Sequence, residues 1–132
     1  MQISAKIESR FHSIETAVQT NDLAQRILIP VKPAGYGPAV NGGELLLLAL
    51  ATCFCNDLYR EAGKRNIAIS AVEVECTGQF GAEGEPGHDF QYTARVSADA
   101  SPAVIDELIR ATDLLAEVHN TLRKGITVKL MT

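Results

Sequence analysis

Apolar and polar residues alternate in the first part of the chain, which is the pattern of β-strands with one face in solvent. Two short extended runs fall within residues 4–18, where Ile14 and Val18 alternate with polar neighbours. Asn21 and Asp22 have the composition of a turn, and residues 25–31 read as a further strand that ends near a proline. The pattern therefore predicts three strands before the first helix.

A long apolar run then predicts a helix over residues 44–62. It follows residues 32–43, a stretch so rich in glycine and proline that it reads as a shaped loop. Asn41 is the expected N-cap, and Gly63 is the expected terminator. The first half of the helix is apolar all round, so we expect it to be buried on every side. The second half turns polar and should emerge towards solvent.

The remainder of the chain predicts a hairpin, one or two helices and a closing strand. Residues 67–80 alternate clearly, residues 81–87 form a polar loop, and residues 90–98 return as the partner strand. Ser101 and Pro102 are a strong helix start. The amphipathic face that follows consists of Val104, Ile105, Leu108, Ile109, Thr112 and Leu115. A short helix over 118–124, capped by Gly125, and a strand over 126–131 complete the prediction.

These elements predict one α+β domain over residues 1–132, with curved antiparallel sheets around a long central apolar helix. A chain of this size can hardly cover such a helix completely, so we expect a homodimer. The net charge is −4 and the basic residues do not cluster, which disfavours nucleic acid as a partner. The N-terminus lacks the pattern of a secretory signal, and the longest apolar stretch is too short to span a bilayer. Three cysteines fit a reducing cytoplasm better than a disulfide framework.

Cys53 is the residue with the clearest chemical potential. On a helix its face carries Leu46, Ala49 and Leu50 on the N-terminal side, which form an apolar wall, and Asn56, Asp57 and Arg60 on the C-terminal side, which form a polar rim. Arg60 would favour a thiolate, whereas Asp57 and burial would oppose it, and the sequence leaves the balance open. Cys53 can equally be a small core residue, as can Cys55 and Cys76.

Other candidates are weaker. The histidines are scattered and the Cys-x-Cys pair lacks further ligands, so we expect neither a metal site nor a cofactor. His119 reads as a surface or hydrogen-bonded histidine, or else as a residue at a pocket mouth. Glu44 at the helix start complements the helix dipole or serves a catalytic role.

The segment from Gly43 to Cys53, which leaves a Gly/Pro loop, resembles the central helix of the OsmC-like proteins, which include organic hydroperoxide resistance proteins. Asn120-Thr-Leu-Arg123, followed by a final strand, resembles the second motif of that family. The resemblance implies an intertwined homodimer with two sites at its interface. It also implies a helix cysteine that attacks an organic hydroperoxide and becomes a sulfenic acid, which a second cysteine resolves.

Carried over by position, the resemblance places Cys53 at the attacking cysteine. The second motif of the family reads Cys-Pro-x-Ser-Asn-Thr-Leu, so its resolving cysteine is replaced here by Ala116. The family's glutamate falls on Gly43, with Glu44 one place later. Its arginine has two candidates, Arg26 and Lys32. The usual two-cysteine cycle therefore cannot run, and the alternative cycle needs an external thiol reductant, or else Cys55 or Cys76 in an unusual geometry.

Three functional hypotheses follow. The first is a redox protein of the stress response in which Cys53 reduces small apolar peroxides, with Glu44 and Arg26 in the catalytic site. Its substrate pocket would be lined by Leu46, Ala49, Leu50, Tyr36 and His119. The second is a dimer that binds a small ligand without catalysis. The third is a hotdog-type enzyme that hydrolyses acyl thioesters with Glu44.

Overall fold

The computed structural model describes the whole chain, Met1–Thr132. The chain divides into two compact units, Met1–Leu45 and Leu46–Thr132, and each is described by itself. The α+β class is confirmed, because antiparallel sheets combine with helices along the chain. The single domain over residues 1–132 stays a prediction.

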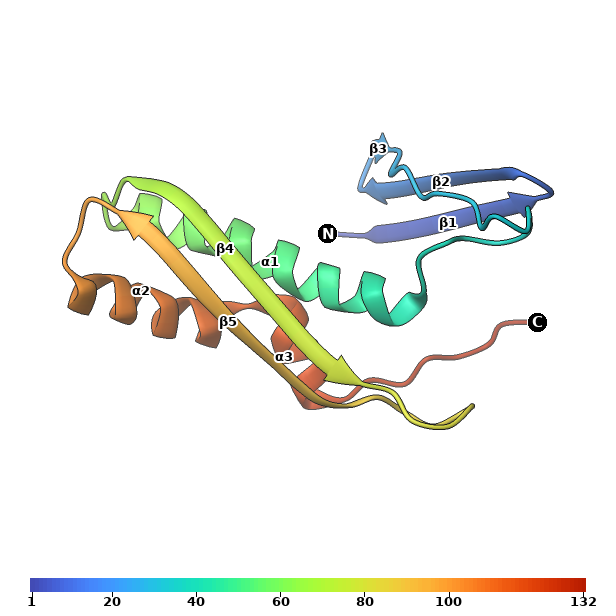
Figure 1. Cartoon of the computed structure of the whole chain (residues 1–132). Coiled ribbons are helices and arrows are strands. Elements are labelled where there is room, and N and C mark those ends of the chain that lie inside the picture. Colours follow the sequence, from blue (N-terminus) through green and yellow to red (C-terminus); the bar gives the residue numbers. More distant parts are fainter. The chain divides into compact units, whose positions relative to one another are not determined.

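The N-terminal unit contains a three-stranded antiparallel sheet in the order β1 (Ile3–Arg10), β2 (Ser13–Thr20), β3 (Leu23–Gln25). Asn21 lies in the predicted turn and adopts a left-handed backbone with φ of 50°. The two runs within residues 4–18 are therefore strands, as predicted (Figure 1).

The strand predicted over residues 25–31 is wrong. β3 ends at Gln25, where the prediction began, and only Val31 pairs further, in an isolated bridge to Pro38. The reason is local competition for the backbone: the Ile27 N–H donates to Oγ1 of Thr16 at 3.1 Å instead of entering a strand ladder. Pro30 has no N–H to donate at all.

Helix α1 (Gly42–Lys64) begins with a reciprocal pair of hydrogen bonds. The Glu44 N–H donates to Oδ1 of Asn41 at 2.8 Å, and the Asn41 N–H donates to Oε1 of Glu44 at 3.0 Å. This capping box confirms Asn41 as the N-cap and satisfies two amide groups that a helix start leaves free. Gly63 does not end the helix, which runs one residue further; Asn66, with φ of 55°, carries the turn that follows.

The C-terminal unit combines a two-stranded antiparallel sheet with helices. Strands β4 (Ile69–Gln79) and β5 (His88–Ala98) form the predicted hairpin. Helices α2 (Pro102–Leu115) and α3 (Glu117–Lys124) follow, as predicted. Oγ of Ser101 caps α2 by accepting the Val104 N–H at 3.3 Å. In Figure 1 the hairpin crosses over α1 and α2, so the unit has a sheet layer and a helix layer. None of the helices combines the length and hydrophobicity that a membrane crossing requires.

The core lies between these two layers. Its buried members come from the second half of α1 and from α2 and the turn after it: Phe54, Leu58, Ala62, Leu108 and Ala116. The hairpin contributes the inward side chains of both strands, which alternate with outward polar ones. Burial of these side chains is the main stabilising term of the unit.

Burial along α1 is the reverse of the prediction. Leu48, in the apolar first half, is 60% exposed, whereas Asp57 and Glu61, in the second half, are 5% and 3% exposed. The second half is covered because the hairpin and α2 pack against it. Its carboxylates are buried among basic partners, so they need not reach solvent.

The strand predicted over residues 126–131 is also wrong, because no strand forms after α3. Ile126, Val128 and Leu130 are 62%, 88% and 90% exposed. Their alternation is that of a strand, but no strand of this chain pairs with it. A strand needs a neighbour to satisfy its backbone groups, so the sequence pattern alone does not make one.

Candidate functional site

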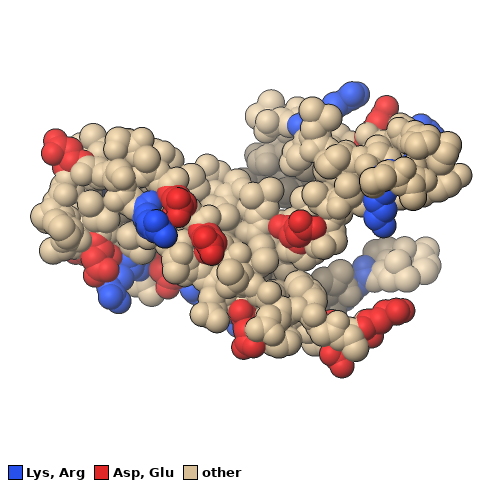
Figure 2. Space-filling model, in the orientation of Figure 1, with Lys and Arg blue, Asp and Glu red and all other residues tan.

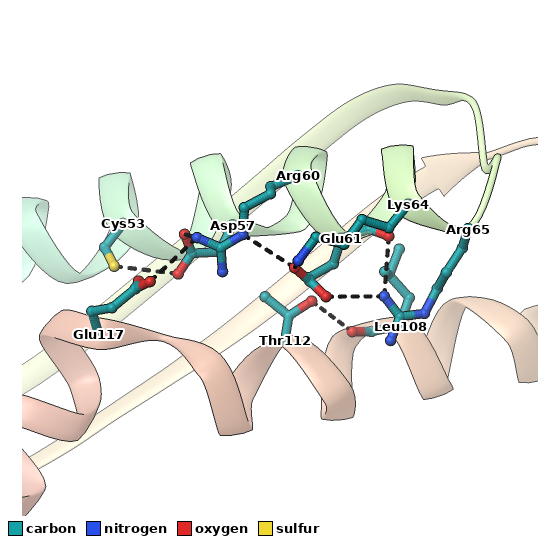
Figure 3. A network of polar contacts seen from close by, with 9 residues as sticks. All are labelled: Cys53, Asp57, Arg60, Glu61, Lys64, Arg65, Leu108, Thr112 and Glu117. Atoms are coloured by element: carbon teal, nitrogen blue, oxygen red, sulfur yellow. Dashed lines mark hydrogen bonds and ion pairs between the residues drawn. The ribbon is translucent and has the colours of Figure 1, made fainter.

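Cys53 lies in the middle of α1 and contacts a carboxylate one turn further along. Its Sγ donates a hydrogen bond to Oδ2 of Asp57 at 3.5 Å (Figure 3). Residues four apart on a helix lie on the same face, so α1 alone fixes this pair. Cys53 is half-buried and Asp57 is buried, so water reaches the thiol but hardly reaches its acceptor.

Arg60 joins this pair to α3. Its Nη1 lies 3.0 Å from Oδ1 of Asp57 and 3.3 Å from Oε1 of Glu117, the first residue of α3. Figure 3 shows the guanidinium group beside both carboxylates, with the sulfur on the far side of Asp57. Arg60 therefore compensates the two carboxylates, and it does not contact the thiol directly.

These surroundings keep the thiol protonated. Burial raises the pKa of Cys53 and the charge of Asp57 raises it further, while the backbone amide of Val118 opposes them. Burial also raises the pKa of Asp57, and the neighbouring carboxylate of Glu117 adds to this effect. The sequence left open whether Cys53 is a thiol or a thiolate. Its surroundings favour the neutral thiol, and the acceptor of its hydrogen bond is a carboxylate with a raised pKa.

The donor atoms of Cys53, Asp57 and Glu117 all lie within 4.8 Å of one another, a spacing that also suits a metal ion. The guanidinium of Arg60 already supplies the positive charge between the carboxylates. The ion pairs of Arg60 with the two carboxylates therefore explain this cluster, and they hold Asp57 in place as the acceptor of the Cys53 thiol.

Glu61 anchors the same face of α1. Its carboxylate pairs with Lys64 at 2.8 Å, Arg60 at 3.1 Å and Arg65 at 3.2 Å. The hydrogen bond from Lys64 and the two arginines hold the pKa of Glu61 at about 2. Because Glu61 fixes Nε of Arg60, it helps to set the position of the guanidinium beside Asp57. On the face of the molecule drawn in Figure 2, basic and acidic side chains are interspersed.

A second group of side chains surrounds His119, which is 4% exposed. Its ring centroid lies 4.7 Å from that of Tyr92 and 5.6 Å from that of Phe54, and neither ring nitrogen has a hydrogen-bond partner. The reading of His119 as a surface or hydrogen-bonded histidine is therefore wrong. Burial lowers its pKa, and the charge of Arg123 lowers it further.

The depressed pKa of His119 predicts a pH dependence of stability. Its folded pKa lies below the unfolded value of about 6.5, so its neutral form contributes fully above that pH, and stability is lost as the pH falls below it. We expect the free energy of unfolding, measured in urea, to fall between about pH 7.5 and 5.5 in the wild type and less in His119→Phe. An equal fall in both proteins would contradict this assignment.

Next to His119 lies a small pocket of about 130 Å³. Leu50 and His119, both predicted as pocket residues, line it. Their neighbours in its wall were not predicted: Phe90, Gln91, Tyr92, Leu122 and Arg123. Arg123 is held by Asp113 at 2.6 Å, and the Tyr92 hydroxyl donates to the same carboxylate.

The other predicted site residues belong to other parts of the chain. Arg26, Lys32, Tyr36 and Glu44 belong to the N-terminal unit, and the Glu44 carboxylate is engaged by the Asn41 amide. Leu46 and Ala49 precede Cys53 on α1 but do not line this pocket, and Ala49 is exposed. Their catalytic and binding roles stay predictions.

All three cysteines are free. Cys55 lines a shallow depression beside Val74, away from the carboxylates. Cys76 lies in β4, and burial raises the pKa of its thiol. Cys53 alone among them donates to a carboxylate.

Sequence reasoning missed Glu117 and the pair of Asp113 and Arg123. Glu117 stands where the second motif of the resembling family has its proline, and that change of residue type was the available signal. Nothing in the spacing of Asp113 and Arg123, on different helices, could reveal their contact.

The profile of the family described as OsmC-like protein matches residues 35–131. No curated protein sequence matches the chain. Among solved structures, an OsmC-like protein from Mycoplasma pneumoniae is 17% identical and superposes with a TM-score of 0.64, over 92% of this chain and 86% of its own. An organic hydroperoxide resistance protein OsmC from Legionella pneumophila is 18% identical, with a TM-score of 0.56 and coverage of 93% and 90%.

A third similar structure is a putative organic hydroperoxide resistance protein from Vibrio cholerae, with captopril bound in one of its active sites. It is 21% identical, with a TM-score of 0.56 and coverage of 93% of this chain and 85% of its own. At these identities the structures show a common fold. The profile match extends over most of the sequence, and on that ground the chain belongs to the family of OsmC-like proteins.

Proposed function

We propose that this protein is a one-cysteine thiol peroxidase that reduces small apolar organic hydroperoxides through Cys53 and uses an external thiol as reductant. The observation that carries the proposal is the hydrogen bond from the Cys53 thiol to the buried carboxylate of Asp57. Membership of a family that includes organic hydroperoxide resistance proteins supports the choice of substrate. Ala116 in place of a second cysteine supports the choice of an external reductant.

The proposed reaction begins when Asp57 takes the thiol proton and the sulfur attacks the outer oxygen of the hydroperoxide. The O–O bond breaks, the alkoxide leaves and takes the proton from Asp57, and Cys53 becomes a sulfenic acid. A first external thiol displaces water from this sulfur and forms a mixed disulfide, and a second releases the Cys53 thiol. The sum is one hydroperoxide and two thiols converted to one alcohol, one water and one disulfide.

The experiment that tests this function is the reaction of the reduced protein with cumene hydroperoxide, followed by intact mass and a sulfenic-acid trap. We expect a single added oxygen, trapped at Cys53. Absence of oxidation over hours would overturn the proposal.

Asp57→Asn tests the role of the carboxylate. Asparagine keeps the size of the side chain but cannot take the thiol proton, so the rate of peroxide consumption should fall about 100-fold, the lower end of the range for general bases. The matched control is Asp106→Asn, which removes an exposed carboxylate that also pairs with an arginine, at 2.8 Å, and should leave the rate unchanged. Equal rates in Asp57→Asn and the wild type would remove Asp57 from the mechanism.

A second candidate function is binding of a small ligand without catalysis. The raised pKa of Cys53 favours it, because the thiolate is the reactive form. The relative with captopril in an active site supports the idea that sites of this family accept small organic molecules. An inert Cys53 in the oxidation experiment would favour this alternative. The hotdog-type thioesterase has only the position of Glu44 in its favour.

We also propose a homodimer in a reducing compartment, the cytoplasm. Leu48 on α1 and the apolar side chains after α3 are exposed in the single chain, and a second copy would cover them. The free cysteines support the compartment. Sedimentation equilibrium should give twice the mass of one chain, and the mass of one chain would rule the dimer out.

A further inference from the structure

The pocket beside His119 has features of a ligand site that the chemistry of Cys53 does not use. Cys53, Asp57 and Glu117 do not line it. Its walls are apolar side chains of α1, β5 and α3 together with four residues that carry polar groups, Gln91 and Tyr92 of β5 and His119 and Arg123 of α3. We propose that this pocket binds a compact apolar carboxylate, such as a single-ring aromatic acid, whose carboxylate pairs with Arg123 and whose ring packs against the apolar wall.

His119 supplies the first argument. Both nitrogens of its ring are buried without a partner, which is rare for polar groups in folded proteins. Because both nitrogens are out of reach, the histidine presents the carbon atoms of its ring to the pocket and serves as part of an aromatic wall. The aromatic contacts with Phe54 and Tyr92 hold the ring plane, so the histidine is already oriented before a ligand arrives.

Arg123 supplies the second argument. Nη1 donates to the Asp113 carbonyl oxygen at 3.2 Å and to Oδ1 of Asn120 at 3.1 Å, and Nη2 donates to Oδ1 of Asp113 at 2.6 Å. None of these three bonds uses the Nε–H, which lies beside the Nη2 group. Two adjacent N–H groups of a guanidinium match the two oxygens of a carboxylate. The bonds already present restrict the side chain, so little rotamer freedom is left to lose on binding.

Charge is compatible with an anion at this position. Arg123 already pairs with Asp113, so a bound carboxylate would share the guanidinium with that side chain. The same molecule shows this arrangement elsewhere, where Arg60 lies between Asp57 and Glu117. The nearest ionisable groups in the pocket wall are otherwise neutral, because Tyr92 keeps its proton and burial disfavours the charged form of His119.

Size limits the ligand. The pocket volume is about 130 Å³, close to the cavity of about 150 Å³ that binds benzene in a well-studied case. One six-membered ring therefore fills the space among Leu50, Phe90 and Leu122. The apolar ring would contact these side chains while the carboxylate faces Arg123.

The probe for the experiment is sodium benzoate, titrated into the wild type and followed by ¹H–¹⁵N NMR and calorimetry. We expect saturable binding with a Kd of about 1 mM or tighter, in the range that fragment-sized ligands reach. Resonances of residues around His119 and Arg123 should shift. Benzyl alcohol has the same ring without the charge and should bind at least about 10-fold more weakly.

Variants locate the site. Arg123→Gln should weaken benzoate binding at least about 10-fold, whereas Arg95→Gln, at an exposed arginine of β5, should not change it. Should Arg123→Gln fail to fold, the comparison of benzoate with benzyl alcohol on the wild type still decides the matter.

Two results would overturn the proposal: no saturable binding of benzoate, or equal binding of benzoate and benzyl alcohol. The inference does not rest on the peroxidase proposal. Cys53→Ser should bind benzoate as the wild type does, so a protein without peroxidase activity can still confirm the pocket, and an active enzyme can still refute it.

Discussion

Replacement of Cys53 by serine is expected to abolish the consumption of organic hydroperoxide. A serine hydroxyl at the same place can still donate to Asp57, so the local structure is kept, but oxygen cannot be oxidised as a thiol sulfur is. The measurement is the loss of cumene hydroperoxide in the presence of excess dithiothreitol. The rate should fall to that of the buffer with dithiothreitol alone.

The other two cysteines are the matched controls. Cys55 lies in a separate depression beside Val74 and Cys76 lies in β4, and neither donates to a carboxylate. Cys55→Ser and Cys76→Ser should therefore retain the wild-type rate. Loss of activity in Cys55→Ser together with full activity in Cys53→Ser would identify Cys55 as the reactive cysteine and refute the assignment to Cys53.

The largest effect on stability is expected from Leu58→Ala. Leu58 has no exposed surface and lies in the core cluster with Phe54 and Leu108. Removal of a buried leucine side chain leaves a cavity and typically costs about 2–5 kcal/mol. The measurement is the free energy of unfolding from urea titration, with the slope of the transition checked for constancy.

Leu114→Ala is the matched control, because it makes the same substitution at an exposed leucine. Leu114 lies on α2 and is 75% exposed, so the same substitution should change the free energy of unfolding by no more than about 0.5 kcal/mol. A large loss in Leu114→Ala would indicate that a partner covers this side chain in solution. A small loss in Leu58→Ala would mean that the core is not where the structure places it.

Local signals predicted most of the elements correctly. The cap at Asn41, the hairpin of β4 and β5 and the start of α2 at Ser101 each follow from residues that lie close together in the sequence. Two of the failures share one cause. The strand over 126–131 and the burial of α1 depend on what lies opposite, and periodicity cannot tell which surface another segment will cover.

In the candidate site too, a contact within one helix could be predicted and a contact between helices could not. Asp57 could be predicted as a neighbour of Cys53 because both lie on one helix face. Glu117 could not, because it reaches Arg60 from another helix far along the chain. The choice between a charged and a neutral thiol depends on burial, which only the packed structure supplies.

The exposed side chains of Ile126, Val128 and Leu130 have a consequence for any measurement of stability. If another chain covers them in the native state, association contributes to the free energy of unfolding, and that contribution grows with the logarithm of protein concentration. The unfolding midpoint should then rise on concentrating the sample. Variants must in that case be compared at equal concentration, since dilution alone would imitate a destabilising mutation.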